Sequence, residues 1–217
     1  MHDRISNSFG LRSALVVANG GLSKNELSKI SGQLFDLIVA ADGGADSLID
    51  TDYSPNLIVG DLDSVSSAAR QAISPENILH IPSQESTDLE KALLVCRDRG
   101  ITDITLVGAF GKRLDHTLNN LSILCRYDRQ FTLTLLEKFS QLFLVRESWE
   151  YHGHPGQTVS LIPLSAISAV QTTGLVYPLN SEPLALGVRE GSSNEITTGA
   201  VRVEVSNGVL AVFVLDD

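Results

Sequence analysis

Short apolar runs alternate with helical patterns through the first 130 or so residues, and this alternation constrains the fold most strongly. The runs are Ala14–Ala18, Leu37–Ala41, Leu57–Val59, Ile78–Ile81, Ile104–Val107 and Phe131–Leu136. Between them lie amphipathic or capped stretches, most clearly Thr87–Arg99 and Leu114–Tyr127. Near-continuous apolar strands joined by helices are typical of a parallel sheet covered by helices on both faces. We therefore predict an α/β class protein with a parallel-sheet (Rossmann-like) α/β/α domain over residues 1–138.

The remainder of the chain has a different pattern. The segments Thr158–Pro163, Ala200–Val205 and Leu210–Leu215 are rich in β-forming residues and are separated by Gly, Pro, Asn and Ser. No long helical period is present there. This pattern predicts a small antiparallel β-sandwich domain over residues 139–217.

Composition excludes several classes of protein. The chain of 217 residues has a formal net charge of −10 and no basic run, so we expect no nucleic-acid partner, because that binding needs a clustered cationic face. No run approaches the roughly 20 apolar residues of a membrane helix, and residues 1–13 contain no apolar core of a signal peptide. The two cysteines form no CxxC unit, and Cys96 falls on an apolar stripe where we expect a buried free thiol. These observations predict a cytoplasmic protein.

Four of the predicted strands end in polar sequences that contain glycine. They are Asn19-Gly20-Gly21, Asp42-Gly43-Gly44, Gly60-Asp61-Leu62-Asp63-Ser64, and the segment from Gly108 to His116. A single Asp-Gly pair is usually just a turn, but ligands of parallel sheets bind at the carboxyl ends of the strands. Glycine backbone N–H groups and helix N-termini suit phosphate. The sequence has neither GxxxxGK[ST] nor GxGxxG, so any nucleotide is bound without the common phosphate loops.

Asp61 and Asp63 directly follow a buried strand. Two carboxylates suit Mg²⁺, which keeps some waters and takes further ligands from phosphate. The alternative is that they cap a helix that opens at Ser64-Val65-Ser66. We favour metal or phosphate binding.

A second acidic motif begins a helix. Thr87 and Glu90 match the capping box [ST]-x-x-E, and the buried stripe expected behind them is Leu89, Ala92, Leu93 and Cys96. Asp88 and Lys91 are spaced i,i+3, which alone is typical of a solvated ion pair. Together with Asp61 and Asp63, Asp88 is interpreted as a third metal-site acid and Lys91 as a cation for phosphate.

The loop after Ile104–Val107 carries Lys112 and Arg113. Arg113 could bind phosphate oxygens through two parallel hydrogen bonds. The helix that follows has apolar positions at Leu114, Leu118, Leu121 and Cys125, with Asp115 and His116 in its first turn. A lone histidine is more often structural than a ligand contact, so His116 is the weaker of these candidates.

Taken together, these motifs resemble the thiamin pyrophosphokinase family over nearly the whole chain. The matching segments in the first domain are Asp42-Gly43-Gly44, Gly60-Asp61-Leu62-Asp63-Ser64, Thr87-Asp88-x-x-Lys91-Ala92 and Gly111-x-Arg113-x-Asp115-His116. Those in the second are Val159-Ser160-Leu161-Ile162-Pro163-Leu164, Gly174-Leu175-x-Tyr177-Pro178-Leu179 and Ser193-Asn194-Glu195. Each motif is short, and it is their order and spacing that make the resemblance specific.

The resemblance implies transfer of a pyrophosphoryl group from Mg-ATP to the thiamin hydroxyl, with release of AMP. It implies a homodimer with active sites at the subunit interface. The implied metal ligands are Asp61, Asp63 and Asp88, which with Lys91 form the catalytic set. The implied thiamin contacts are Ser193 and Asn194. The implied ATP contacts are Asn19, Gly20, Asp42, Gly43, Gly44, Gly60, Ser64, Thr87, Gly111, Arg113, Asp115 and His116.

One departure from the family pattern lies beside the second acidic motif. Where the family often has a Lys-Asp pair, this chain has Gln84-Glu85, which keeps an acid and loses a positive charge. Two rival functions remain open on the sequence. A metal-dependent phosphohydrolase would need only the α/β domain, and a non-catalytic module that senses thiamin or a nucleotide would not need the charged clamp.

Overall fold

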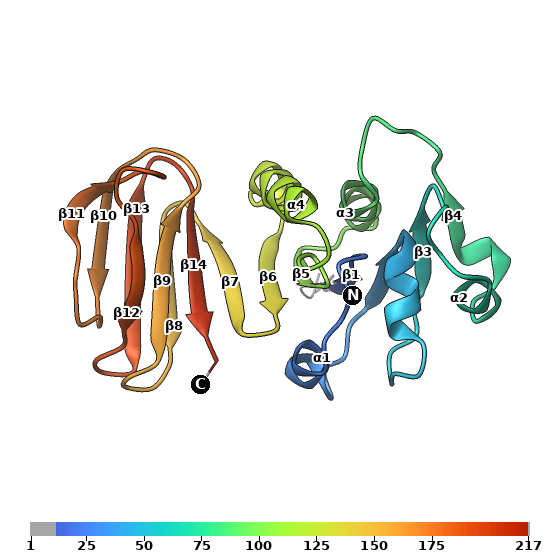
Figure 1. Ribbon diagram of the computed structural model, residues 1–217, viewed down its shortest axis with the longest axis horizontal. Coiled ribbons are helices and arrows are strands. Elements are labelled where there is room, and N and C mark those ends of the chain that lie inside the picture. Colours follow the sequence, from blue (N-terminus) through green and yellow to red (C-terminus); the bar gives the residue numbers. More distant parts are fainter. Residues whose placement is uncertain (1–11, 217) are drawn as a thin grey trace, which may run out of the picture. The chain divides into compact units, whose positions relative to one another are not determined.

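The computed structural model describes residues 12–216 (Figure 1). The chain forms two compact units, one of residues up to 22 together with 30–132, and one of residues 23–29 together with the chain from 133 onward. The boundary expected at 138/139 falls in the turn between strands β6 (Thr132–Glu137) and β7 (Ser140–Val145) and stays a prediction. Most of the N-terminal stretch considered for a signal peptide lies outside the described residues.

The first unit contains a parallel sheet, as the strand–helix alternation predicts. Its strands are β1 (Ser13–Val17), β2 (Leu37–Ala41), β3 (Leu57–Gly60), β4 (Ile78–His80) and β5 (Asp103–Val107). They lie in the order β5-β1-β2-β3-β4, and every pair is parallel. The chain therefore reverses its direction of winding at the β1–β5 pair, the position where open α/β sheets commonly bind ligands.

Helices connect these strands. They are α1 (Lys24–Ile30), α2 (Ser67–Gln71), α3 (Asp88–Asp98) and α4 (Leu114–Tyr127), with 3-10 turns η1 (Asp42–Leu48) and η2 (Pro75–Asn77). Helix α3 packs on β1, β2 and β3 through the predicted stripe of Leu89, Ala92, Leu93 and Cys96, all of which are buried. This packing fixes the start of α3 beside the ends of β2 and β3.

The second unit contains most of α1 and a set of antiparallel strands, which are coloured yellow to red in Figure 1. Its remaining strands are β8 (Ser148–His152), β9 (Thr158–Pro163), β10 (Ile167–Thr173), β11 (Asn180–Leu184), β12 (Gly191–Glu195), β13 (Ala200–Ser206) and β14 (Leu210–Leu215). Their orders are β12-β9-β14-β7-β6 and β11-β10-β13-β8. Side chains of β9, β10, β13 and β14 share one apolar core, and burial alternates along β9 and β13. This is the predicted sandwich arrangement.

Helix α4 differs from its apolar pattern. Leu114 is 74% exposed and Leu118 is also exposed, whereas the buried residues of α4 are Ile123 and Leu124. The spacing predicts the helix bounds correctly but not the residues that face the core of this unit. Across residues 12–216, no helix is both long and apolar enough to cross a membrane.

Candidate active site

The four polar strand ends lie at one edge of the parallel sheet, as predicted, because β1, β2, β3 and β5 run in the same direction. The loops after β1 and β5 touch each other, and the Gly20 amide donates to the Gly108 carbonyl oxygen over 2.6 Å. A Cβ atom at Gly20 would collide with the carbonyl oxygens of Gly108 and Phe110. Glycine is therefore required at position 20 to close this part of the edge.

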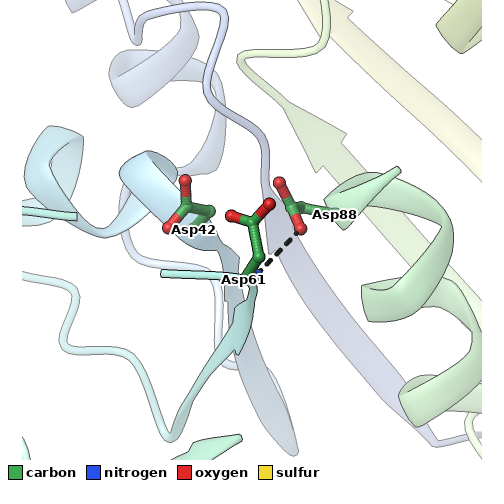
Figure 2. Close-up of side chains that lie close together, drawn as sticks. All are labelled: Asp42, Asp61 and Asp88. Carbon is green, nitrogen blue, oxygen red and sulfur yellow. Dashed lines mark hydrogen bonds between the residues drawn. The ribbon is translucent and has the colours of Figure 1, made fainter. Parts of the chain in front are cut away.

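Three carboxylates from different elements meet at this edge (Figure 2). Asp42 follows β2, Asp61 follows β3, and Asp88 is the first residue of α3. One oxygen of each lies within 4.8 Å of the others, and the Asp61 amide donates to Asp88 Oδ1 over 3.3 Å. A Cβ at Gly60 would lie 2.9 Å from Asp42 Cβ and 3.0 Å from Asp88 Oδ1, so Gly60 leaves the room in which the cluster forms.

Asp42 is the most unusual member of the cluster. It is 2% exposed, its φ is 45°, and its Oδ2 accepts from the Ser64 amide over 3.1 Å. Its Oδ1 is buried and has no hydrogen-bond partner. Burial raises the pKa of this carboxyl, and the nearby Asp88 adds to the increase. A divalent cation would satisfy the unpartnered oxygen and the excess negative charge.

The other two carboxylates have polar partners. Gln84 Nε2 donates to Asp61 Oδ2 over 2.9 Å, and this hydrogen bond is the main reason that the pKa of Asp61 is lowered. Lys91 Nζ lies 2.9 Å from Asp88 Oδ1. Lys91 is 3% exposed, so this is not the solvated pair that its spacing alone predicts. Its ammonium group offsets one of the three negative charges.

Asp63 lies outside this cluster. Strand β3 ends at Gly60, and Leu62 has a φ of 67°, so the strand alternation that would align Asp61 with Asp63 is interrupted. The exposed Asp63 carboxylate accepts from Ser64 Oγ over 2.8 Å. The metal role of Asp63 stays a prediction. Asp42, which the sequence predicts as an ATP contact, is the third carboxylate of the cluster.

The helix-capping interpretation of Asp61 and Asp63 is wrong. Helix α2 begins at Ser67, and its N-cap is Ser66, whose side chain accepts from the Ala69 amide over 3.1 Å. Neither aspartate caps it.

The cluster opens into a cleft of about 800 Å³ that lies within the first unit. The predicted residues that line it are Asn19, Gly20, Asp42, Asp61, Asp63, Ser64, Thr87, Asp88, Lys91, Gly111, Arg113 and His116. The other predicted residues of this unit, which are Gly43, Gly44, Gly60 and Asp115, do not line it.

Cationic side chains stand in the loop between β5 and α4. Lys112 Nζ donates to Asn19 Oδ1 over 2.9 Å. Arg113 donates from Nε and Nη2 to the two oxygens of Asp115, over 3.1 and 2.5 Å, and the hydrogen bond to this guanidinium lowers the pKa of Asp115 to about 2. Because both partners are exposed, water screens the pair and phosphate can compete for the guanidinium.

The start of α3 is only half of a capping box. Thr87 Oγ1 accepts from the Glu90 amide over 3.3 Å, as the motif predicts. The Glu90 carboxylate instead reaches α4, where it accepts from the Tyr127 hydroxyl over 3.0 Å and pairs with Arg126. The capping pattern accounts for Glu90 locally and so does not predict this contact. No motif in the sequence points to Arg126 or Asn120, which line the cleft.

Ser193 and Asn194 lie on β12 in the second unit. Asn194 is buried; its Oδ1 accepts from the amides of Tyr177 and Glu195 over 3.0 and 2.9 Å, and its Nδ2 donates to the Tyr177 carbonyl oxygen over 2.7 Å. The side chain of Tyr177 is exposed. Ser193 is exposed, and its amide donates to Ser160 Oγ over 3.0 Å. Asn194 therefore holds the segment that presents Tyr177.

Two family models match the chain. Residues 33–135 match the thiamin pyrophosphokinase catalytic domain, and residues 150–210 match the thiamin pyrophosphokinase vitamin B1 binding domain. Together the two matches cover well over half of the chain, and they fall mainly on the first and second units respectively.

Curated relatives and solved structures agree with these matches. A thiamine pyrophosphokinase 1 of Arabidopsis thaliana is 28% identical over 232 residues, covering 94% of this chain and 86% of the relative. The thiamine pyrophosphokinase of Bacillus subtilis is 28% identical over 204 residues, covering 90% and 94%. The crystal structure of thiamine pyrophosphokinase from Bacillus subtilis superposes with a TM-score of 0.82 at 24% identity, covering 95% of this chain and 100% of that one. Thiamin pyrophosphokinase from Candida albicans gives a TM-score of 0.82 at 20% identity, covering 95% and 90%.

Proposed function

This chain belongs to the thiamin pyrophosphokinase family, and from that premise we propose how its residues transfer a pyrophosphoryl group from ATP to thiamin. In this reaction the thiamin hydroxyl oxygen bonds to the β-phosphorus, the bond from the β-phosphorus to the oxygen bridging it to the α-phosphorus breaks, and AMP leaves. The protein must align the two substrates, neutralise the polyphosphate and exclude water. The rival function of a metal-dependent phosphohydrolase is not supported by the comparisons.

The observation that carries the proposal is the unpartnered Oδ1 of Asp42 within the three-carboxylate cluster. We propose that Asp42, Asp61 and Asp88 hold Mg²⁺, since hard carboxylate oxygens are the ligands this ion prefers. The ion would supply charge neutralisation on the polyphosphate. Asp63, which lines the same cleft, remains proposed as a further ligand, and the acceptor of the hydroxyl proton is proposed among Asp61, Asp63 and Asp88.

Side chains around the cluster are proposed to bind the triphosphate of ATP. Lys91 contributes a buried ammonium group beside Asp88, and Arg113 contributes a guanidinium whose planar donors match phosphate oxygens. Asn19, Gly20 and Gly111 line the cleft where the β1 and β5 loops meet, which favours backbone contacts to the nucleotide. His116 and Thr87 line the cleft at the starts of α4 and α3.

The same proposal extends to Gly43, Gly44, Gly60, Ser64 and Asp115 as residues that shape the ATP site. Gly43 and Gly44 follow Asp42 in the buried turn η1. Asp115 holds the Arg113 guanidinium. Their part is to position the groups that contact ATP.

Thiamin binding is proposed for Ser193 and Asn194, in the unit matched by the vitamin B1 binding domain. We further propose a homodimer in which the active sites form at the subunit interface, and a cytoplasmic location. Thiamin is a cation, so the acidic charge of the chain, −10, would favour its approach.

The test incubates the purified protein with ATP, Mg²⁺ and thiamin, and separates the products by chromatography. We expect AMP and thiamin diphosphate in equal amounts, and neither product when thiamin or Mg²⁺ is omitted. Loss of ATP at the same rate without thiamin would contradict the proposal and favour a hydrolase.

A further inference from the structure

Glu90 is a buried acid for which the transfer chemistry has no direct use. It is 8% exposed and lies in the first turn of α3, between Asp88 and Lys91. Its carboxylate leaves its own helix and contacts the last turn of α4. A buried carboxylate is tolerated only where partners compensate the loss of water, so these contacts are essential to its position.

The partners of Glu90 are two consecutive residues of α4. The Tyr127 hydroxyl donates to Glu90 Oε1 over 3.0 Å. Arg126 brings Nη1 to 3.1 Å from Oε1 and Nη2 to 3.3 Å from Oε2. Both carboxylate oxygens are thus occupied. Burial, followed by the hydrogen bond to Glu90, raises the pKa of Tyr127, as expected for a hydroxyl that donates to a carboxylate.

These contacts join the two helices that line the cleft. Helix α3 supplies Asp88, Leu89, Glu90 and Lys91 to the cleft, and α4 supplies residues from His116 to Arg126. Glu90 thus lies at the cleft wall while both of its carboxylate oxygens are held by α4. A shift of α3 against α4 would move Asp88 away from Asp42 and Asp61, and would change the width of the cleft. Displacements of about 1 Å at such sites can lower rates roughly 100-fold.

We propose that Glu90 is a positioning residue, which through Tyr127 and Arg126 sets the separation of α3 and α4 and so holds Asp88 and Lys91 in place for the nucleotide. The inference rests on the proposed function, because it assumes that this cleft binds Mg-ATP. It goes beyond that function in giving a role to Glu90, at an unspecified position of the Thr87–Ala92 motif, and to Arg126 and Tyr127, which lie outside the motifs. Glu90 acts through α4 and does not touch the reacting atoms.

The experiment compares Glu90→Gln and Tyr127→Phe with the unmodified protein. Tyr127 does not line the cleft, so Tyr127→Phe loosens the contact without removing a group from the site. We measure KM for Mg-ATP, KM for thiamin and kcat, together with direct binding of the non-transferable analogue α,β-methylene-ATP in the absence of thiamin. We expect KM for Mg-ATP and the analogue Kd to rise about 10-fold in Glu90→Gln and about 3-fold in Tyr127→Phe, on the scale of one or two buried polar contacts. KM for thiamin should change less than about 2-fold, because the contact lies wholly in the first unit.

A coupled contact also predicts non-additivity. In the double variant the rise in the analogue Kd should be close to that of Glu90→Gln alone, because the second change removes a bond that is already weakened. The matched control is Arg97→Gln, which removes an exposed ion pair with Asp98 on the same helix and should leave all constants unchanged.

Three outcomes overturn the proposal. Unchanged nucleotide constants in both variants would show that the contact is only structural. A similar loss of kcat in Glu90→Gln and Tyr127→Phe, with both KM values unchanged, would indicate that a smaller fraction of each variant is folded. Thermal unfolding would show this. An effect in Glu90→Gln with none in Tyr127→Phe would mean that Glu90 acts by direct contact with the nucleotide. Failure of the unmodified protein to form thiamin diphosphate would instead refute the proposed function, so the two failures are distinguishable.

Discussion

The α/β unit and the β-sandwich unit use buried polar side chains in opposite ways. In the α/β unit, Asp42 keeps a buried oxygen without a partner, and three carboxylates crowd together. In the β-sandwich, the buried Asn194 uses its amide to hold the backbone around Tyr177. The first arrangement costs stability and is suited to a ligand, whereas the second stabilises the fold and presents neighbouring groups. The difference shows that the crowded carboxylates lie in the first unit, whereas the buried amide of Asn194 in the second unit is used to hold backbone.

The largest expected effect tests the carboxylate cluster. Asp61→Asn removes a negative charge while keeping the shape of the side chain, and we expect kcat to fall at least roughly 100-fold, the scale of losing a strong electrostatic contribution to catalysis. Steady-state kinetics at saturating substrates measures this. Asp98→Asn, on the exposed part of α3, is the matched control. Near-normal turnover of Asp61→Asn would remove Asp61 from the metal site.

A second prediction tests whether the carboxylate cluster requires a residue without a side chain at position 60. In Gly60→Ala the added methyl group would press on Asp42 and Asp88, and we expect kcat to fall about 10-fold or more because the ligand atoms move apart. Thermal unfolding should show that the variant is folded. If Gly60→Ala retains full activity, the cluster does not depend on this close approach.

The third prediction concerns the β-sandwich. Asn194→Ala removes the hydrogen bonds to Tyr177 and Glu195, and we expect the free energy of unfolding of this unit to fall by about 1–3 kcal/mol. KM for thiamin should rise, whereas binding of α,β-methylene-ATP without thiamin should be unchanged. Denaturant unfolding and calorimetric titration measure these quantities. Loss of nucleotide binding in Asn194→Ala would contradict the proposal that the first unit binds the nucleotide and the second unit binds thiamin.

The smallest expected effect is on stability and follows from the raised pKa of Asp42. A carboxyl whose pKa is higher in the folded protein stabilises the fold while it is protonated. This stabilisation is lost as the pH rises from the unfolded-state pKa of 3.8 through the raised value. In EDTA at pH 7, Asp42→Asn should therefore unfold at a temperature a few degrees above the unmodified protein, and the difference should vanish below the unfolded-state pKa. A lower unfolding temperature for Asp42→Asn at pH 7 would show that the charged Asp42 carboxylate does not destabilise the folded protein.

Sequence predicts the edge of the parallel sheet well, and for a definite reason. Strands that run in parallel bring their carboxyl ends together, so Asp42, Asp61 and Arg113 could be assigned to one edge from the order of apolar runs alone. The capped start of α3 follows from Thr87 by local hydrogen bonding in the same way. The sheet edge and the start of α3 are therefore predicted by the order of apolar runs and by local hydrogen bonding, without knowledge of how side chains pack.

Other parts of the site depend on tertiary structure that the pattern does not contain. The left-handed Leu62 interrupts the alternation, so that the Asp63 amide donates to Asp61 Oδ1 over 3.3 Å and the Asp63 carboxylate lies outside the cluster. Glu90 satisfies a local capping motif in sequence, but its side chain finds partners 36 and 37 residues away. The exposed Leu114 likewise shows that apolar spacing does not decide which face of a helix is buried. In each case a long-range contact or a single backbone angle prevails over local preference.

The most direct test of the account is the binding of a divalent metal with nucleotide to Asp42. Mn²⁺ binding in the presence of α,β-methylene-ATP is measured by electron paramagnetic resonance for the unmodified protein and for Asp42→Asn. We predict that the unmodified protein binds the metal–nucleotide complex and that Asp42→Asn binds it at least about 10-fold more weakly, as expected for loss of one charged ligand. Equal affinity of the two proteins would show that the Asp42, Asp61 and Asp88 cluster is not the metal site.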